Sequence, residues 1–197
     1  MSVKYRMHKR AAREEETRQR IVEAAVTLHA ELGPSRTSIL ALSRRAGVSR
    51  PTIYRHFPDQ RSLLAACSSH TRTHNPPPSL AAWEQIGDPE RRIGVALTQL
   101  FEYYAANENI LAHVLRDADD DPLVHEASAP RRRYMTEASS LLTRPWNVRG
   151  AKKRRLRAAI AHAIAFPTWR SLVQAEGLGE RDAIKLLTGL VRAAATD

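Results

Sequence analysis

The sequence contains one cysteine, Cys67, and has no apolar run of 18 residues or more. A single thiol excludes a disulfide within the chain and fits a reducing compartment. Cys67 could be a redox sensor, but the pattern favours a small residue packed on a helix. A membrane-spanning helix needs about 20 apolar residues, and the N-terminus lacks the apolar centre of a signal peptide. We therefore expect a cytoplasmic protein.

The motifs of several enzyme classes are also absent. The sequence has no G-x-S-x-G, P-loop, H-E-x-x-H or paired C-x-x-C, so it indicates no nucleophile, phosphate cradle or zinc site. Five residues, 117–121, form an acidic run beside Pro122, which could hold a metal with His113 or His125 but is more typical of a solvated turn. We expect no catalytic residue, cofactor or resident metal.

The net charge of +10 is concentrated at the N-terminal end. Residues 1–62 hold 13 Lys and Arg against 6 Asp and Glu, whereas residues 63–197 hold 18 against 15. Such a basic end binds polyanions, and the two candidates are nucleic acid and an anionic membrane surface. The membrane is the weaker candidate, because the apolar face required for it is also needed to cover the neighbouring helices.

The stretch 39–57 predicts two short helices joined by a tight turn. Ile39, Leu42 and Ala46 recur at steps of three and four, as on one face of an amphipathic helix. Gly47 suits the left-handed residue that ends such a helix.

The second short helix is predicted to start at Ser49, an N-cap residue, and to tolerate Pro51 in its first turn. Ile53 and Phe57 are four residues apart and are expected to point inward. The outward side chains are basic, hydroxylic or aromatic, and none is acidic. A helix-turn-helix places its second helix in the major groove of DNA, and this outer face suits that task.

From Thr17 to Leu64 the chain resembles the DNA-binding end of TetR-family transcriptional regulators. The resemblance rests on two segments, TRQRIVEAAVTLHAELG and TSILALSRRAGVSRPTIYRHFPDQRSLL. It implies an all-α homodimer with an N-terminal three-helix helix-turn-helix domain. A bridging helix would join that domain to a C-terminal helical bundle for ligand binding and dimerisation.

The resemblance also implies roles for individual residues. Arg50, Pro51 and Thr52 are expected to meet base edges, Tyr54 and His56 to meet phosphates, and Ser38 and Ser49 to anchor helix starts. The chemistry agrees, because a guanidinium binds guanine O6 and N7 and a methyl group contacts thymine. Further DNA contacts are expected at four positions: Arg44, Arg55, Gln60 and Arg61. Gln60 departs from the family, which often has lysine there, and Arg61 could substitute for it.

Domain boundaries follow from charge and from helix breakers. Residues 1–13 are expected to form a disordered basic arm that either enters a DNA groove or remains a solvated tail. The helix-turn-helix domain should occupy residues 14–62, with its first buried stripe running from Ile21 to Leu32. The bridging helix should span residues 59–74, starting at the N-cap Asp59. The ligand-binding and dimerisation domain should span residues 79–197.

The C-terminal part predicts several amphipathic helices, including segments 123–142, 152–174 and 181–194. Residues 131–133 should lie on or near the outer side of the first, and Pro167 should kink the second. The last two helices have more apolar surface than one layer would cover, which fits dimerisation. Residues that could line an effector pocket are Leu97, Phe101, Glu102, Tyr104, His113, Met135, His162, Phe166 and Trp169, although a core role is the simpler alternative for each.

Three function classes therefore remain. The favoured one is a sequence-specific transcriptional regulator, a repressor released by an apolar or aromatic small molecule, that binds a near-palindromic operator in double-stranded DNA as a homodimer. A constitutive nucleic-acid-binding dimer is the second, and a small helical enzyme is the third. The 120 or so residues beyond the motif favour the first, since a constitutive binder needs only enough helix to dimerise.

Overall fold

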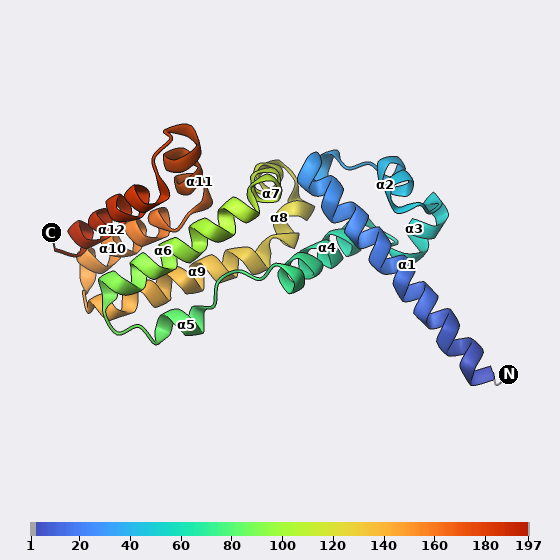
Figure 1. Ribbon diagram of the computed structural model, residues 1–197, viewed down its shortest axis with the longest axis horizontal. Coiled ribbons are helices and arrows are strands. Elements are labelled where there is room, and N and C mark those ends of the chain that lie inside the picture. Colours follow the sequence, from blue (N-terminus) through green and yellow to red (C-terminus); the bar gives the residue numbers. More distant parts are fainter. Residues whose placement is uncertain (1–2, 197) are drawn as a thin grey trace. The chain divides into compact units, whose positions relative to one another are not determined.

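The computed structural model describes residues 3–196, with side chains described from residue 7 onward. The regular elements in this range are all helices, joined by loops, and the range contains no strand (Figure 1). Its elements are α1 (Val3–Glu31), η1 (Pro34–Arg36), α2 (Ile39–Ala46), α3 (Arg50–His56), α4 (Gln60–His74), α5 (Leu80–Glu84), α6 (Pro89–Ala106), α7 (Glu108–Asp120), α8 (Pro122–Ala127), α9 (Ala129–Thr143), η2 (Arg144–Trp146), α10 (Gly150–Ala163), α11 (Phe166–Trp169), η3 (Arg170–Ala175) and α12 (Glu180–Thr196). None of these helices is long and apolar enough to span a bilayer.

The chain divides into two compact units. Unit 1 comprises Met1–Pro76 and Asn109–Ser128, and unit 2 comprises Pro77–Glu108 and Ala129–Asp197. The division after Pro76 falls between the expected bridging helix, residues 59–74, and the expected C-terminal domain, residues 79–197. Residues 109–128 are placed differently: from the sequence we expect them in the C-terminal domain, whereas in the structure they belong to unit 1. These residues belong to unit 1 because α7 and α8 bond directly to η1 and α4.

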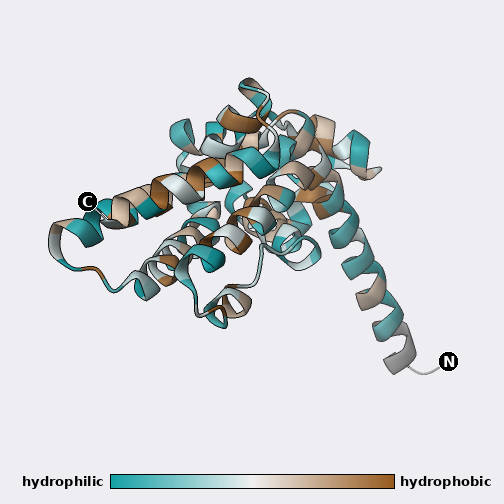
Figure 2. Cartoon of the chain, turned by 60° about the vertical axis from the view of Figure 1, so that its left-hand side comes forward, coloured by the Kyte–Doolittle hydropathy of each residue, from teal (hydrophilic) through white to brown (hydrophobic). Residues whose placement is uncertain are grey.

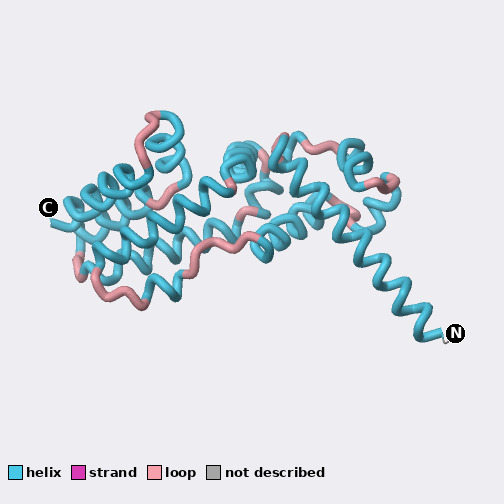
Figure 3. Tube along the Cα trace, viewed as in Figure 1, coloured by secondary structure: helices cyan, strands magenta, loops and turns pink. Residues whose placement is uncertain are grey.

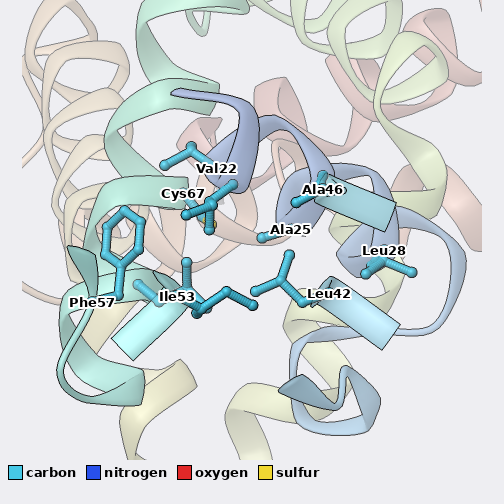
Figure 4. Packing of buried hydrophobic residues seen from close by; sticks show 11 residues of the cluster. Val22, Ala25, Leu28, Leu42, Ala46, Ile53, Phe57 and Cys67 are labelled. Atoms are coloured by element: carbon cyan, nitrogen blue, oxygen red, sulfur yellow. The ribbon is translucent and has the colours of Figure 1, made fainter. Parts of the chain in front are cut away.

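The core of unit 1 is formed where α1, α2, α3 and α4 meet. Figure 4 shows Val22, Ala25 and Leu28 of α1 facing Leu42 and Ala46 of α2, Ile53 of α3, and the residues Phe57 and Cys67. All of these side chains are buried. The inward positions of Ile53 and Phe57 are therefore confirmed. Leu32 is different: it is 42% exposed, because α1 ends at Glu31 and the chain turns away from the stripe.

The N-terminal part of α1 contradicts the expected disordered arm. The helix begins at Val3, and the part of it that follows the grey residues in Figure 2 is largely hydrophilic. Residues 3–13 contain no glycine or proline, and the Arg10 Nε atom donates to Glu14 at 3.2 Å, an i,i+4 pair of the kind that supports helices. Residues 1 and 2 lie outside the described part of the chain.

In unit 2, α6, α9, α10 and α12 pack side by side (Figures 1 and 3). Its fully buried side chains include Trp83, Leu97, Leu100, Leu156 and Ile160. Two helices expected from the sequence are interrupted. Segment 123–142 is split at Ser128 between α8 and α9. Segment 152–174 breaks at residues 164–165, before Pro167, and continues as α11 and the π-helical turn η3.

Candidate DNA-binding interface

Local capping fixes the corner between α2 and α3. The Ser38 hydroxyl accepts the Ala41 N–H at 3.1 Å, and the Ser49 hydroxyl accepts the Thr52 N–H at 3.3 Å. Gly47 adopts φ 65°, ψ 34°, a left-handed conformation that a side chain would strain. The Ser43 hydroxyl donates to the Val48 carbonyl at 2.6 Å and closes the turn seen in Figure 3. These contacts confirm the predicted helix starts and the predicted turn.

The outward face of α3 presents the residues that the sequence assigns to DNA. Arg50, Pro51 and Arg55 are exposed, and Tyr54 keeps 51% of its surface accessible. Thr52 is half-buried, and its hydroxyl lies 2.9 Å from that of Ser49. The first turn of α3 therefore offers a guanidinium, a proline ring and a partly shielded threonine to a neighbouring surface.

The interface is positive because its stretch of chain contains no carboxylate. Segment 38–57 has four arginines and no Asp or Glu. Arg45 is held by Glu31 of α1 through hydrogen bonds of 2.9 and 2.7 Å. These bonds lower the pKa of the Glu31 carboxyl. Arg44, Arg50 and Arg55 form no ion pair with any described residue, so they remain available to phosphate or base oxygens.

Two residues that are expected to contact phosphate, His56 and Arg61, are placed differently in the structure. The Nε2 atom of His56 is buried and has no hydrogen-bond partner among the described residues, so this atom does not face a phosphate. Arg61, the suggested substitute for a lysine at position 60, forms an ion pair with Glu126 of α8. Gln60 is exposed as the first residue of α4, next to the N-cap Asp59.

A second layer of contacts, which the sequence pattern does not reveal, supports the loop before α2. Asp117 of α7 is 6% exposed, and its Oδ2 atom accepts the Ser35 N–H at 3.0 Å. The Asp121 carboxylate accepts the Ser35 hydroxyl at 2.9 Å. The acidic run is therefore solvated only in part, because Asp119 and Asp120 are exposed whereas Asp117 and Asp121 bind Ser35. It clamps η1, and within the described residues no group of three or more His, Cys, Asp or Glu is arranged to hold a metal ion.

Most residues expected near an effector belong to the core of unit 2. Leu97, Phe101, Tyr104, Phe166 and Trp169 are buried. Tyr104, Phe166 and Trp169 form an aromatic cluster with ring centroids 5.5–6.0 Å apart. The Tyr104 hydroxyl donates to the Ile164 carbonyl at 2.5 Å and lies 3.9 Å from the sulfur of half-buried Met135. The Trp169 N–H is buried without an acceptor among the described residues.

Three polar residues expected in the same pocket lie elsewhere. Glu102 and His162 are exposed, so neither belongs to this buried cluster. His113 belongs to unit 1, where its Nδ1 atom lies 3.3 Å from the His29 carbonyl oxygen. Helical spacing places all three beside apolar neighbours, but spacing does not reveal which helix covers a face.

The single thiol is buried in the core of unit 1. Cys67 is 5% exposed, and burial raises the pKa of its thiol to about 12. Because the thiolate is the reactive species, this environment disfavours a redox-sensing role.

The capped corner between α2 and α3 and the exposed α3 face have the form of a helix-turn-helix. Residues 21–67 match the family described as bacterial regulatory proteins, tetR family. The resemblance to the TetR family is thereby confirmed at the DNA-binding end of the chain.

Known proteins extend this likeness. The HTH-type transcriptional regulator Rv2250c of Mycobacterium tuberculosis, itself uncharacterized, is 45% identical over 51 residues, which are 26% of this chain and 27% of that protein. The chain thus matches about a quarter of the length of this curated relative.

Solved structures share the fold over most of the chain. A TetR-like transcriptional regulator from Rhodococcus sp. RHA1 aligns with a TM-score of 0.66 at 20% identity, covering 92% of this chain and 97% of that one. FadR from Bacillus subtilis, in complex with stearoyl-CoA, aligns with a TM-score of 0.60 at 17% identity, covering 90% and 97%. At these identities the likeness concerns the fold.

Proposed function

We propose that the protein is a transcriptional regulator that binds a near-palindromic DNA operator as a homodimer and is a repressor released by a small-molecule effector. One observation carries the DNA-binding part: the α3 face is exposed, positive and free of carboxylates, while the opposite face is fixed in a buried core. A helix that only packed would not require such an outer face. The family match of residues 21–67 and the relative's name support the same function.

Selection of random duplexes by the full-length protein tests this part. We expect enrichment of a two-fold symmetric site whose half-site centres are about 34–36 Å apart or somewhat more. The triple variant Arg44→Ala, Arg50→Ala, Arg55→Ala keeps the core and serves as the control. Enrichment of no sequence, or equal enrichment by this variant, would refute sequence-specific binding through α3.

The homodimer is proposed to form through α10 and α12. The large apolar residues that unit 2 leaves exposed within the described chain are Leu186 and Leu190, both on α12, at 55% and 46% exposure. They lie four residues apart and therefore on one face of that helix. We expect Leu186→Asp with Leu190→Asp to produce a monomer in light scattering at micromolar concentration. Exposed Leu40 belongs to unit 1, and Leu40→Asp is the matched control that should remain dimeric.

The effector is proposed to bind unit 2 beside the aromatic cluster of Tyr104, Phe166 and Trp169. The three rings form part of the buried apolar interior of unit 2, and the unpaired Trp169 N–H is a donor whose burial costs about 1–3 kcal/mol until it finds an acceptor. The fold neighbour crystallised with stearoyl-CoA supports a ligand with a long apolar part. We therefore continue to propose an apolar or aromatic effector, as expected from the sequence.

Calorimetric titration into free and operator-bound protein tests effector control. A ligand that releases DNA must bind the free form more tightly by the factor with which it weakens DNA binding, typically about 5–150-fold. Equal affinity for both forms excludes coupling for that compound. No coupling across a panel of apolar metabolites would favour the constitutive DNA-binding dimer.

A further inference from the structure

Arg131, in the first turn of α9, is a half-buried cation without an acidic partner. No ion pair and no hydrogen bond joins its guanidinium to another residue in the range 7–196. Burial lowers its pKa, and the groups that favour its charge are the phenols of Tyr104 and Tyr103. The structure thus corrects the sequence-based expectation that Arg131 lies on or near the outer side of its helix.

The surroundings of Arg131 are apolar and phenolic. Tyr134 and Met135 follow it by three and four residues, so they share its face of α9. That face meets α6, because the Met135 sulfur lies 3.9 Å from the Tyr104 hydroxyl. Tyr103 continues the same cluster, with its ring centroid 6.0 Å from that of Tyr104. The phenols of Tyr103 and Tyr104 are therefore the groups that favour the charge of Arg131 from α6.

Unit 2 also contains an arginine whose role is structural, and the contrast is informative. Arg92 is 8% exposed and donates to the carbonyls of Ile86 at 2.7 Å, Glu84 at 3.1 Å and Leu141 at 3.4 Å. These bonds compensate for its burial. Arg131 has no such carbonyls. Withdrawing a cation from water is unfavourable without a partner, so its position favours a partner from outside the chain.

The start of α9 adds to the positive potential. The N-terminal end of a helix carries partial positive charge and favours anions, yet the first turn of α9 contains no acidic residue and is followed by Arg132 and Arg133. A neutral donor is available beside it as well. The hydroxyls of Tyr104 and Tyr134 donate to backbone carbonyls, whereas the Tyr103 hydroxyl has no hydrogen-bond partner among the described residues.

We propose that Arg131 binds the oxyanion of an amphiphilic effector, a carboxylate, sulfonate or phosphate, with the Tyr103 hydroxyl as a second donor. The apolar part of the same molecule packs on Tyr103, Tyr134 and Met135. This assignment rests on the effector-controlled function proposed above and narrows its ligand class from apolar compounds to apolar anions. Guanidinium suits the task because its planar fork of N–H donors forms paired hydrogen bonds with two oxygens of such a group.

The test uses two pairs of probes that differ in charge. Anilinonaphthalene sulfonate and phenylnaphthylamine are fluorescent and differ by the sulfonate, and decanoate and decanol are the aliphatic pair, measured by calorimetry. Wild-type protein should bind the anionic member of each pair more tightly. Arg131→Gln should weaken the anions at least about tenfold, the loss of one charged hydrogen bond, and leave the neutral probes within about twofold. Arg133→Gln removes the same charge from an exposed neighbour and should change neither.

Three results would overturn the assignment: unchanged anion affinity in Arg131→Gln, equal loss of anionic and neutral probes, or no anion preference in the wild type. Arg131→Met repeats the test if circular dichroism shows that Arg131→Gln does not fold. Operator release separates this proposal from the wider function. If decanoate binds through Arg131 but does not release the operator DNA, the anion site is upheld and control of DNA binding through that site is refuted. Release by decanol and decanoate alike, unaffected by Arg131→Gln, upholds effector control and refutes the anion site.

Discussion

Gly33 joins α1 to η1 at a position where a methyl group would meet two obstacles. Its φ of 98° and ψ of 153° lie in a region that only glycine occupies readily, so alanine there costs about 1–3 kcal/mol in backbone strain. A Cβ atom would also lie 2.6 Å from the Asp117 Oδ2 atom and 2.5 Å from Nη2 of Arg116. Arg116 is exposed and can move aside, but Asp117 is buried and holds the Ser35 N–H. Losing that charged hydrogen bond adds about 1.5–3 kcal/mol.

We therefore expect Gly33→Ala to lower the free energy of unfolding of unit 1 by about 2.5–6 kcal/mol, measured by urea denaturation. Gly47→Ala is the matched control, because Gly47 has φ 65° but a Cβ atom there would meet nothing within 4 Å. It should cost only about 1–2 kcal/mol. A Gly33→Ala value equal to that of Gly47→Ala would show that the Asp117 contact contributes nothing and would refute the reasoning.

Other expectations concern DNA reading and acid stability. Arg50→Ala should weaken the preferred operator by about 1–3 kcal/mol and relax preference at one base position, while Tyr54→Phe should weaken all sequences alike; equal losses of Arg50→Ala on operator and random duplex in anisotropy titrations would make Arg50 a phosphate contact only. His29 is 4% exposed, and burial lowers its pKa to about 4, against the opposing charge of Asp117. The folded state thus resists protonation, so stability is complete above pH of about 6.5 and falls by about 2 kcal/mol at pH 5. In the variant His29→Gln, the urea midpoint should depend less on pH over this range. An unchanged pH dependence would mean that other groups cause it.

Local signals account for what the sequence predicts well. Ser38, Gly47, Ser49 and Asp59 set helix ends through contacts within a few residues, so neighbours along the chain suffice to identify them. The inward positions of Ile53 and Phe57 follow from helical period alone. Tertiary contacts decide the rest.

Asp117 illustrates what a sequence pattern cannot reveal. Its neighbours are typical of a solvated acidic run, but its partner is the backbone of Ser35, 82 residues away. Arg131 is similar: helical period predicts its direction on α9, but it does not reveal that the phenols of Tyr103 and Tyr104 on α6 act on its charge. Glu102 and His162 show the reverse error: they are expected in a pocket but are exposed. A polar residue that has apolar neighbours in the sequence is just as often on the solvent-facing side of its helix. The helix over residues 3–13 shows that high charge alone does not imply disorder when every residue is a fair helix former.

The buried thiol of Cys67 makes this chain suited to distance measurements. With its pKa raised to about 12 and its sulfur enclosed by the unit 1 core, the native cysteine presents almost no thiolate to alkylating reagents near neutral pH. A cysteine introduced at exposed Arg55 on α3 can therefore carry a spin label or a dye selectively, with Cys67 left in place. Two copies of such a label in one dimer would report the separation of the reading helices directly, in the free, ligand-bound and DNA-bound forms.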